Sequence, residues 1–414
     1  MRDEHEARRA PAAEVTRTST LPARLSAVTA GIAVLVSAVP TSAQWTTEVT
    51  VTEPAGIRRT AFPTSARFEI PAGRVEHGDQ MRLSSGQEEV PSQVTAWSFW
   101  PDGSIREVDV DFNVSIGPSE QRSFEIHYGP DVTTEASARR GLEVDEDERT
   151  IDVGRIRLNK GGYTLLASVD YRDELIAPGR NGLTVVERSG IRRDPREIRW
   201  SSVEVVKPGP LRVLARYRGA LTLSGGSTAE ITLDVEMPNS KSWLAMSVSV
   251  SDPDAKIGDL GFETPLQLGT QPWTWDFATP NRTYGAFRDP TGSATFERTL
   301  GADGDAGWTV RAGPAGAEEP YEMGTITGAG SSTWAHFVGP DEAVAFAVDE
   351  RTGAPGTISV WLTGTGQTTV TFRSSEPATE HDLTVYEHYV ATPVPIGAAT
   401  SPASILAPLH VAVD

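Results

Sequence analysis

The chain has 414 residues, no cysteine and a formal net charge of −19. This charge argues against nucleic-acid binding, because an acidic surface repels a phosphate backbone, and the absence of cysteine excludes disulfides and a lipid-modified cysteine. The sequence is rich in Gly and Pro and shows no long amphipathic helical pattern. It therefore predicts an all-β protein with many turns.

Residues 1–43 are predicted to be a signal peptide. An apolar run from Leu25 to Val39 has the length of a signal-peptide core, Arg24 precedes it, and small residues lead to a cut at Gln44. The segment before this run is long and contains acids, which suggests a start codon further downstream. A membrane anchor is the alternative. With cleavage, we expect a secreted, periplasmic or cell-surface protein with no membrane contact beyond this segment.

A first domain is predicted over residues 44–135. It begins with a Thr/Val-rich segment, Gln44 to Pro54, that forms an edge strand or stays mobile. Strand-like segments follow at Ala66–Pro71 and Met81–Leu83, and Ser123–Tyr128 closes the domain. Alternating residues and turn signals make each of these a short strand.

The clearest element of this domain is a hairpin from Val90 to Phe112. Its turn, Pro101-Asp102-Gly103, combines a residue with fixed φ, a backbone-capping carboxylate and a residue that tolerates positive φ. In the second strand, Val108, Val110 and Phe112 alternate with acidic residues. This alternation predicts a half-buried strand with its acids on the solvent face.

A second domain is predicted over residues 136–414. A charged connector, Asp131 to Arg149, leads into strands that recur every eight to twelve residues, a spacing typical of a large antiparallel sandwich. This pattern is strongest in the following segments: Ile151–Leu158, Leu211–Leu223, Ile231–Met237, Trp243–Val250, Trp334–Phe372 and Asp382–Tyr389.

Two blocks resemble the exo-rhamnogalacturonan lyase family, which includes the bacterial YetA-like proteins. The first is the order ARFEIP, EVPSQ and WPDGSIR within Arg58 to Tyr128, and the second is GPLR at Gly209–Arg212 with KIGDLGFETP at Lys256–Pro265. The resemblance implies a small RIFT-type β-barrel followed by a β-sandwich, and β-elimination on pectin-type polysaccharide. Full-length relatives continue into a helical toroid, and this sequence contains no helical repeat.

Catalytic candidates are Tyr386 and His388, which alternate within one predicted strand and so share a face. Removing a proton beside a uronate carboxylate needs a base and a neutralising cation. The alternative is an ordinary strand with aromatic cross-strand pairs and a structural histidine.

Glycan-binding candidates lie in two further segments. Trp273 and Trp275 share a strand face and offer a platform for sugar rings, with Asp276 and Arg282 beside them. Arg192 and Arg193 offer guanidinium groups to a carboxylate. Core packing is the alternative for the tryptophans, and a solvated loop paired with nearby acids is the alternative for the arginines.

No cofactor or metal is predicted. The acidic turns Asp252-Pro253-Asp254 and Asp303-Gly304-Asp305 lack the spacing of a Ca²⁺ loop, and no nucleotide, metalloprotease or serine-hydrolase motif occurs. Three functions remain: a secreted polysaccharide lyase, a non-catalytic glycan-binding protein, and a structural surface protein. The expected partner is a polysaccharide, and the oligomeric state stays open.

Overall fold

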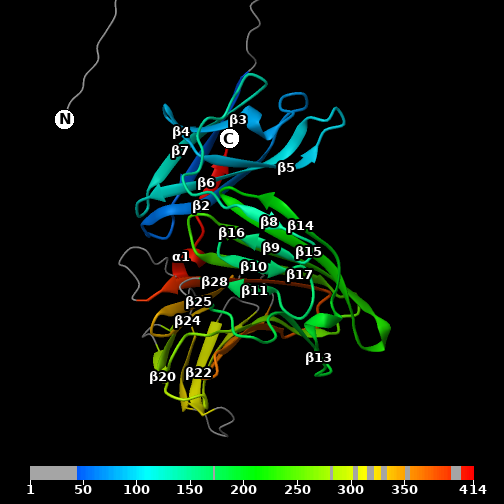
Figure 1. Cartoon of the computed structure of the whole chain (residues 1–414), viewed down its shortest axis with the longest axis vertical. Helices are drawn as coiled ribbons and strands as arrows, with labels where there is room; N and C mark the ends of the chain where they lie inside the picture. The colour runs from blue at the N-terminus through cyan, green and yellow to red at the C-terminus, as the bar shows by residue number, and fades with distance from the viewer. Residues whose placement is uncertain are drawn as a thin grey trace, which may run out of the picture. The chain divides into compact units, whose positions relative to one another are not determined.

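The computed structural model describes residues 44–170, 173–279, 283–301, 306–314, 321–327, 333–349, 355–392 and 402–414. Within these ranges the strands form five antiparallel sheets (Figure 1). Helical structure there is limited to α1 (Pro402–Leu406) and three short 3-10 turns (Gly78–Gln80, Pro195–Glu197 and Ser224–Gly226). The predicted all-β fold is confirmed. None of the described helices is long and apolar enough to span a bilayer, and the predicted signal peptide lies outside the described residues.

Two sheets enclose one core and form what we call the small β unit. The five-stranded sheet has the order β29-β1-β7-β3-β4 and the three-stranded sheet the order β2-β6-β5. Their strands are β1 (Trp45–Thr52), β2 (Arg59–Glu69), β3 (Met81–Ser85), β4 (Glu88–Val90), β5 (Ser92–Phe99), β6 (Ile105–Ile116), β7 (Gln121–Tyr128) and β29 (His410–Val413). The rings of Phe112 and Phe124 meet across this core, with centroids 5.1 Å apart.

The predicted hairpin is present as β5 and β6. Asp102 Oδ1 accepts hydrogen bonds from the backbone N–H of Ser104 at 3.0 Å and from its hydroxyl at 2.6 Å, and Gly103 has a φ of +88°. The turn therefore forms for the expected reasons. The outer face of β6 differs from the prediction, because Asp109 and Asp111 are buried.

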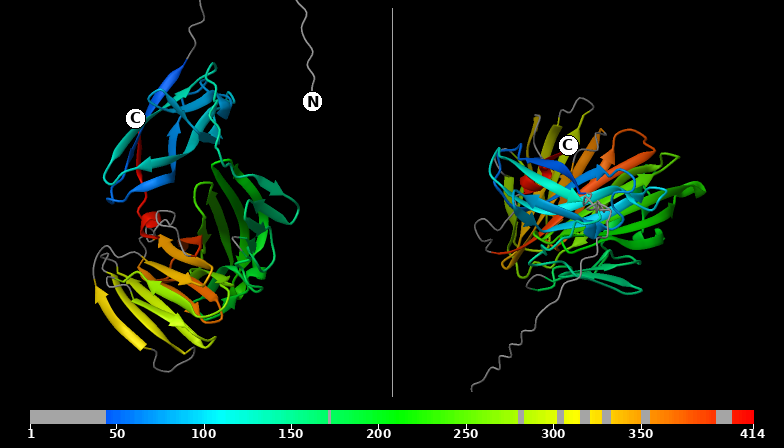
Figure 2. Two further views of the ribbon diagram at one scale, coloured as in Figure 1. Left: turned by 60° about the vertical axis from the view of Figure 1, so that its left-hand side comes forward. Right: turned by 90° about the horizontal axis from the view of Figure 1, so that it is seen from above.

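The last described strand belongs to the small β unit. β29 pairs antiparallel with β1, so that Val49 lies opposite Val413, and Figure 2 shows this red strand beside the blue one. Two predictions change as a result. The Gln44–Pro54 segment is an inner strand with partners on both sides, and the end of the predicted 136–414 domain returns to the first unit.

The remaining strands build the sandwich, with a four-stranded sheet beside it in the order β11-β10-β9-β8. The large sheets have the orders β13-β12-β18-β27-β26-β21-β22-β23 and β14-β15-β16-β17-β28-β25-β24-β19-β20. The strand bounds are β8 (Val144–Glu146), β9 (Thr150–Val153), β10 (Ile156–Asn159), β11 (Leu166–Val169), β12 (Gly182–Glu187), β13 (Arg192–Arg193), β14 (Arg199–Pro208), β15 (Arg212–Thr222), β16 (Thr228–Pro238), β17 (Trp243–Ser251), β18 (Ile257–Pro265), β19 (Trp273–Phe277), β20 (Thr283–Phe287), β21 (Gly292–Leu300), β22 (Ala306–Pro314), β23 (Tyr321–Thr327), β24 (Thr333–Val338), β25 (Glu342–Asp349), β26 (Gly356–Thr363), β27 (Gln367–Ser374) and β28 (Glu380–Ala391).

The sandwich core lies between the eight-stranded and nine-stranded sheets. In β16, Leu233 and Val235 are buried in this core, whereas Asp234 and Glu236 alternate with them on the other face. This alternation is typical of a sheet with one face on a core. The opposite face of the nine-stranded sheet, which we call its outer face, is therefore polar in β15 and β16.

Gln93 makes one of the contacts between the small β unit and the sandwich. Gln93 accepts hydrogen bonds from the N–H groups of Leu211 and Arg212 at 2.8 and 2.9 Å and donates one to the Arg212 carbonyl oxygen at 2.9 Å. The segment before β29 is held separately. Buried Arg59 donates to the carbonyl oxygens of Ser404 and Ala407 and pairs with buried Glu53 at 3.1 Å.

Candidate functional site

The predicted tryptophan platform is part of the core. Trp273 and Trp275 are only 8% and 5% exposed. The Trp273 ring meets Phe337 with centroids 5.6 Å apart, and Trp275 meets Phe277 at 5.2 Å. Phe277 on the same face of β19 stacks on Phe296 of the eight-stranded sheet, with centroids 5.6 Å apart, so this aromatic face is covered by the opposite sheet. These two residues therefore cannot stack on a bound sugar, and the core alternative holds.

Three of the other glycan-binding candidates already pair with side chains of this protein, and the fourth lies outside the described residues. Asp276 accepts a 2.7 Å hydrogen bond from His336 on the outer face, and Arg282 lies outside the described residues. Arg192 pairs with Glu263. Arg193 pairs with two carboxylates, those of Glu187 and Glu197. Both arginines thus follow the paired alternative that the sequence left open.

The two catalytic candidates share a strand face, as predicted, but they do not share a cavity. Tyr386 lines the cavity described next. His388 is 3% exposed, meets the Trp243 ring edge-on with centroids 6.2 Å apart, and lines a different cavity. The pair therefore does not form one catalytic centre.

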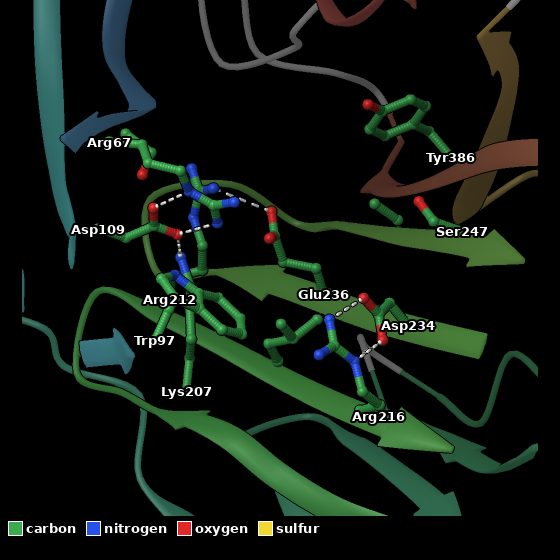
Figure 3. Close-up of a pocket in the computed structure, with 13 residues that line it drawn as sticks. Arg67, Trp97, Asp109, Lys207, Arg212, Arg216, Asp234, Glu236, Ser247 and Tyr386 are labelled. Carbon is green, nitrogen blue, oxygen red and sulfur yellow. Dashed lines mark hydrogen bonds and ion pairs between the residues drawn. The ribbon is translucent and has the colours of Figure 1, made fainter. Parts of the chain in front are cut away.

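A cavity of about 420 Å³ lies between the hairpin of the small β unit and the outer face of the nine-stranded sheet; we call it the charged cavity (Figure 3). Its lining combines side chains from β2, β5 and β6 with others from β14 to β17 and β28. The lining residues are Ser65, Arg67, Trp97, Asp109, Lys207, Arg212, Leu214, Arg216, Asp234, Glu236, Ala245, Ser247 and Tyr386.

The floor of the charged cavity is a buried ionic network. Lys207 Nζ lies 2.9 Å from Asp109 and 2.8 Å from Asp111, and all three side chains are at most 5% exposed. Arg212 lies 3.4 Å from Asp111. Burial alone raises the pKa of Asp109, but hydrogen bonding from Arg67 and the charge of Lys207 outweigh it and lower the pKa to about 2. Asp109 therefore stays ionised at neutral pH.

The rim is more exposed and surrounds an aromatic ring. Arg216 makes a two-pronged pair with Asp234, at 2.7 and 2.6 Å, and the Arg67 side chain is 56% exposed. The guanidinium carbons of Arg67 and Arg216 lie 5.1 and 5.5 Å from the Trp97 ring centroid. In Figure 3, Tyr386 lies across the cavity from the Arg67–Asp109 pair.

This arrangement suits the binding of a polyhydroxylated ligand. Paired arginines and carboxylates place hydrogen-bond donors and acceptors next to each other, which matches neighbouring hydroxyls. A half-buried indole adds a flat apolar surface. The carboxylates of the lining are ion-paired, so they are poorly suited to donate protons. Among the described residues, no group of three or more metal-ligating side chains occurs.

The sequence contained a signal for this site that we did not use. Arg212, Arg216, Asp234 and Glu236 lie at even spacing within strands, so charges of opposite sign occupy one face of adjacent strands. The acids of β6 show the same spacing. What the sequence alone does not reveal is that these two faces meet.

No family model and no curated protein matches the sequence. Among solved structures, an alpha-mannosidase from Enterococcus faecalis V583 is similar with a TM-score of 0.54 and 10% identity, over 89% of this chain and 46% of that one. A glycosyl hydrolase family 38 protein from Enterococcus faecalis gives 0.53 and 9%, over 89% and 47%. At this identity the likeness shows the fold, and this chain spans less than half of either protein.

Proposed function

We propose that the protein binds a carbohydrate chain, with one sugar residue seated in the charged cavity. The observation that carries this proposal is the half-buried Trp97 ring surrounded by ion pairs that present both donors and acceptors. The fold shared with an alpha-mannosidase and a glycosyl hydrolase family 38 protein supports a carbohydrate-associated role.

The charge of the cavity favours a neutral sugar residue. Its four cations, Arg67, Lys207, Arg212 and Arg216, face four carboxylates, those of Asp109, Asp111, Asp234 and Glu236. An incoming anion would have to displace an existing pair, whereas neutral hydroxyls can join the network. The resemblance to exo-rhamnogalacturonan lyases supports a pectin-type chain, in which uronate residues alternate with neutral ones.

Binding without catalysis is the form of this proposal that the geometry favours. β-Elimination needs a base near a carboxylate-binding cation, and of the two predicted bases only Tyr386 lines the charged cavity. A lyase reaction would therefore depend on Tyr386. The release of an unsaturated, ultraviolet-absorbing product that disappears in Tyr386→Phe would favour the lyase over the binding protein.

The test is calorimetric titration with neutral and pectin-derived oligosaccharides. Trp97→Ala should weaken binding roughly tenfold or more, because it removes the apolar surface for the sugar ring. Trp361→Ala is the matched control, since Trp361 is a 39% exposed tryptophan outside the cavity lining. Equal affinity in the wild type and Trp97→Ala would show that the sugar binds outside the charged cavity. No binding of any oligosaccharide would favour a structural surface protein.

Export from the cytoplasm is part of the same proposal, since polysaccharide would be met outside the cell. N-terminal sequencing of exported material should begin at or near Gln44. An intact N-terminus held in the membrane would instead indicate an anchor.

A further inference from the structure

A second cavity, of about 620 Å³, lies where the loop from Met237 to Trp243 faces the β9–β10 hairpin. It is separate from the charged cavity, because the two linings share no residue. Its walls contain apolar side chains of Val153, Met237 and Trp243, which are at most 5% exposed. A hollow of this size whose lining combines apolar and polar side chains can hold a small molecule.

The charge of this second cavity is one-sided, and we call it the cationic cavity. Arg140, Arg155 and Lys241 line it, and its described lining contains no Asp or Glu. In a chain with a net charge of −19, a lining that contains cations and no carboxylate is unexpected. The charged cavity, in contrast, matches each cation with an acid.

Lys241 has a neutral partner only. Its Nζ donates to the Thr60 carbonyl oxygen at 2.7 Å, and neither Lys241 nor Arg140 pairs with a carboxylate in the part of the chain that the structure describes. Burial lowers the pKa of Lys241, because the ammonium loses hydration without gaining a counter-ion. A bound anion would supply that counter-ion.

We propose that the cationic cavity binds a small organic carboxylate with an apolar, ring-like body. The carboxylate would lie against Lys241 and Arg140, and the apolar body against Trp243 and Met237. A sugar fits less well, because the lining contains no carboxylate to accept strong hydrogen bonds from its hydroxyls. This ligand class is independent of carbohydrate binding in the charged cavity.

The test uses 2-naphthoate and its neutral counterpart, 2-naphthamide, in calorimetric titrations of the wild-type protein at neutral pH and low salt. We expect naphthoate to bind at least roughly tenfold more tightly than the amide, since a hydrogen-bonded charge pair adds to the same apolar contact. Equal binding of the two compounds, or no binding of naphthoate, would overturn the proposal.

Variants locate the binding. Lys241→Met should remove most of the preference for naphthoate, Lys241→Arg should keep it, and Arg140→Gln should weaken naphthoate by a smaller factor. Arg216→Gln, in the charged cavity, should leave naphthoate affinity unchanged. If Lys241→Arg binds normally and Lys241→Met binds as tightly as the wild type, the ammonium has no role and the proposal fails. Oligosaccharide binding in the same variants reports on the charged cavity separately.

Discussion

At the scale of single residues, Lys207 is the centre of the charged cavity's floor. Its side chain is 3% exposed, and its ammonium lies within 3 Å of two carboxylates whose side chains are at most 5% exposed. Two buried carboxylates that face each other repel strongly unless a cation separates them. The floor is therefore a structural support for the more exposed rim that would contact a ligand.

Lys207→Met should destabilise the protein by up to roughly 3–5 kcal/mol. It removes the cation that both buried carboxylates share and leaves Asp109 with Arg67 alone and Asp111 with Arg212 alone. Urea unfolding at neutral pH measures the loss. Arg218→Gln is the control: Arg218 and Glu204 form a pair in which both side chains are 48% exposed, so its loss should cost roughly 0–1 kcal/mol. A loss of similar size in the two variants would show that the buried network contributes little.

Glu387 differs from the ion-paired carboxylates, because its pKa is raised and its contribution to stability therefore falls as the pH rises. Burial raises its pKa above 4.5, although hydrogen bonds from Thr264 at 2.5 Å and Tyr389 at 2.6 Å act to lower it. A carboxyl group whose pKa is raised on folding binds its proton more tightly in the native state, so its stabilisation is present below pH 4.5 and is lost as the pH rises. Glu387→Gln should remove this loss.

The measurement for Glu387→Gln is the free energy of unfolding from pH 4 to pH 8. The variant should gain stability relative to the wild type as the pH rises, because the amide never ionises. Glu380→Gln, at an exposed position of the same strand, should show no such trend. A constant difference between Glu387→Gln and the wild type across this range would contradict the raised pKa.

At the scale of elements, strands were predictable wherever alternation was strong. The hairpin of β5 and β6 and the long strands β15, β16 and β17 follow the predicted segments, because local pattern and turn chemistry agree there. Two assignments failed for a shared reason. The outward face of β6 and the aromatic face of β19 are each covered by a distant sheet, and contact between distant segments leaves no mark in a local pattern.

The segment before β29 is also held by contacts that local pattern does not show. Arg59→Met should cost roughly 3–5 kcal/mol, since it leaves Glu53 buried without its cation and two carbonyl oxygens without a donor. Hydrogen exchange should become faster in β29 before it does in the sandwich. Arg106→Gln, which breaks a half-exposed pair with Glu69, is the control and should leave β29 protected.

At the scale of the whole molecule, the two blocks of family resemblance meet each other. Gln93 of the VPSQ segment binds the backbone of Leu211 and Arg212 in the GPLR segment. These motifs therefore fix how the small β unit sits on the sandwich, and with it the walls of the charged cavity.

Gln93→Ala should weaken the contact between the small β unit and the sandwich. Losing three hydrogen bonds at a buried site should cost roughly 1–3 kcal/mol, and the amides of Leu211 and Arg212 should exchange faster. Oligosaccharide affinity should fall as well, although Gln93 does not line the charged cavity. Gln121→Ala, at an exposed position in β7, serves as the control. Unchanged hydrogen exchange at Leu211 and Arg212 would show that other contacts hold the small β unit against the sandwich.

The pairing of β29 with β1 has a consequence for the protein during its synthesis. β1 is made first among the described strands, yet the neighbour on its outer side appears only after the whole sandwich has been translated. Throughout that interval the nascent chain carries an open sheet edge, the kind of surface on which other chains add strands. Synthesis of the sandwich strands must therefore precede the closure of the small β unit, and until β29 pairs with β1 the open edge can accept a strand from another chain.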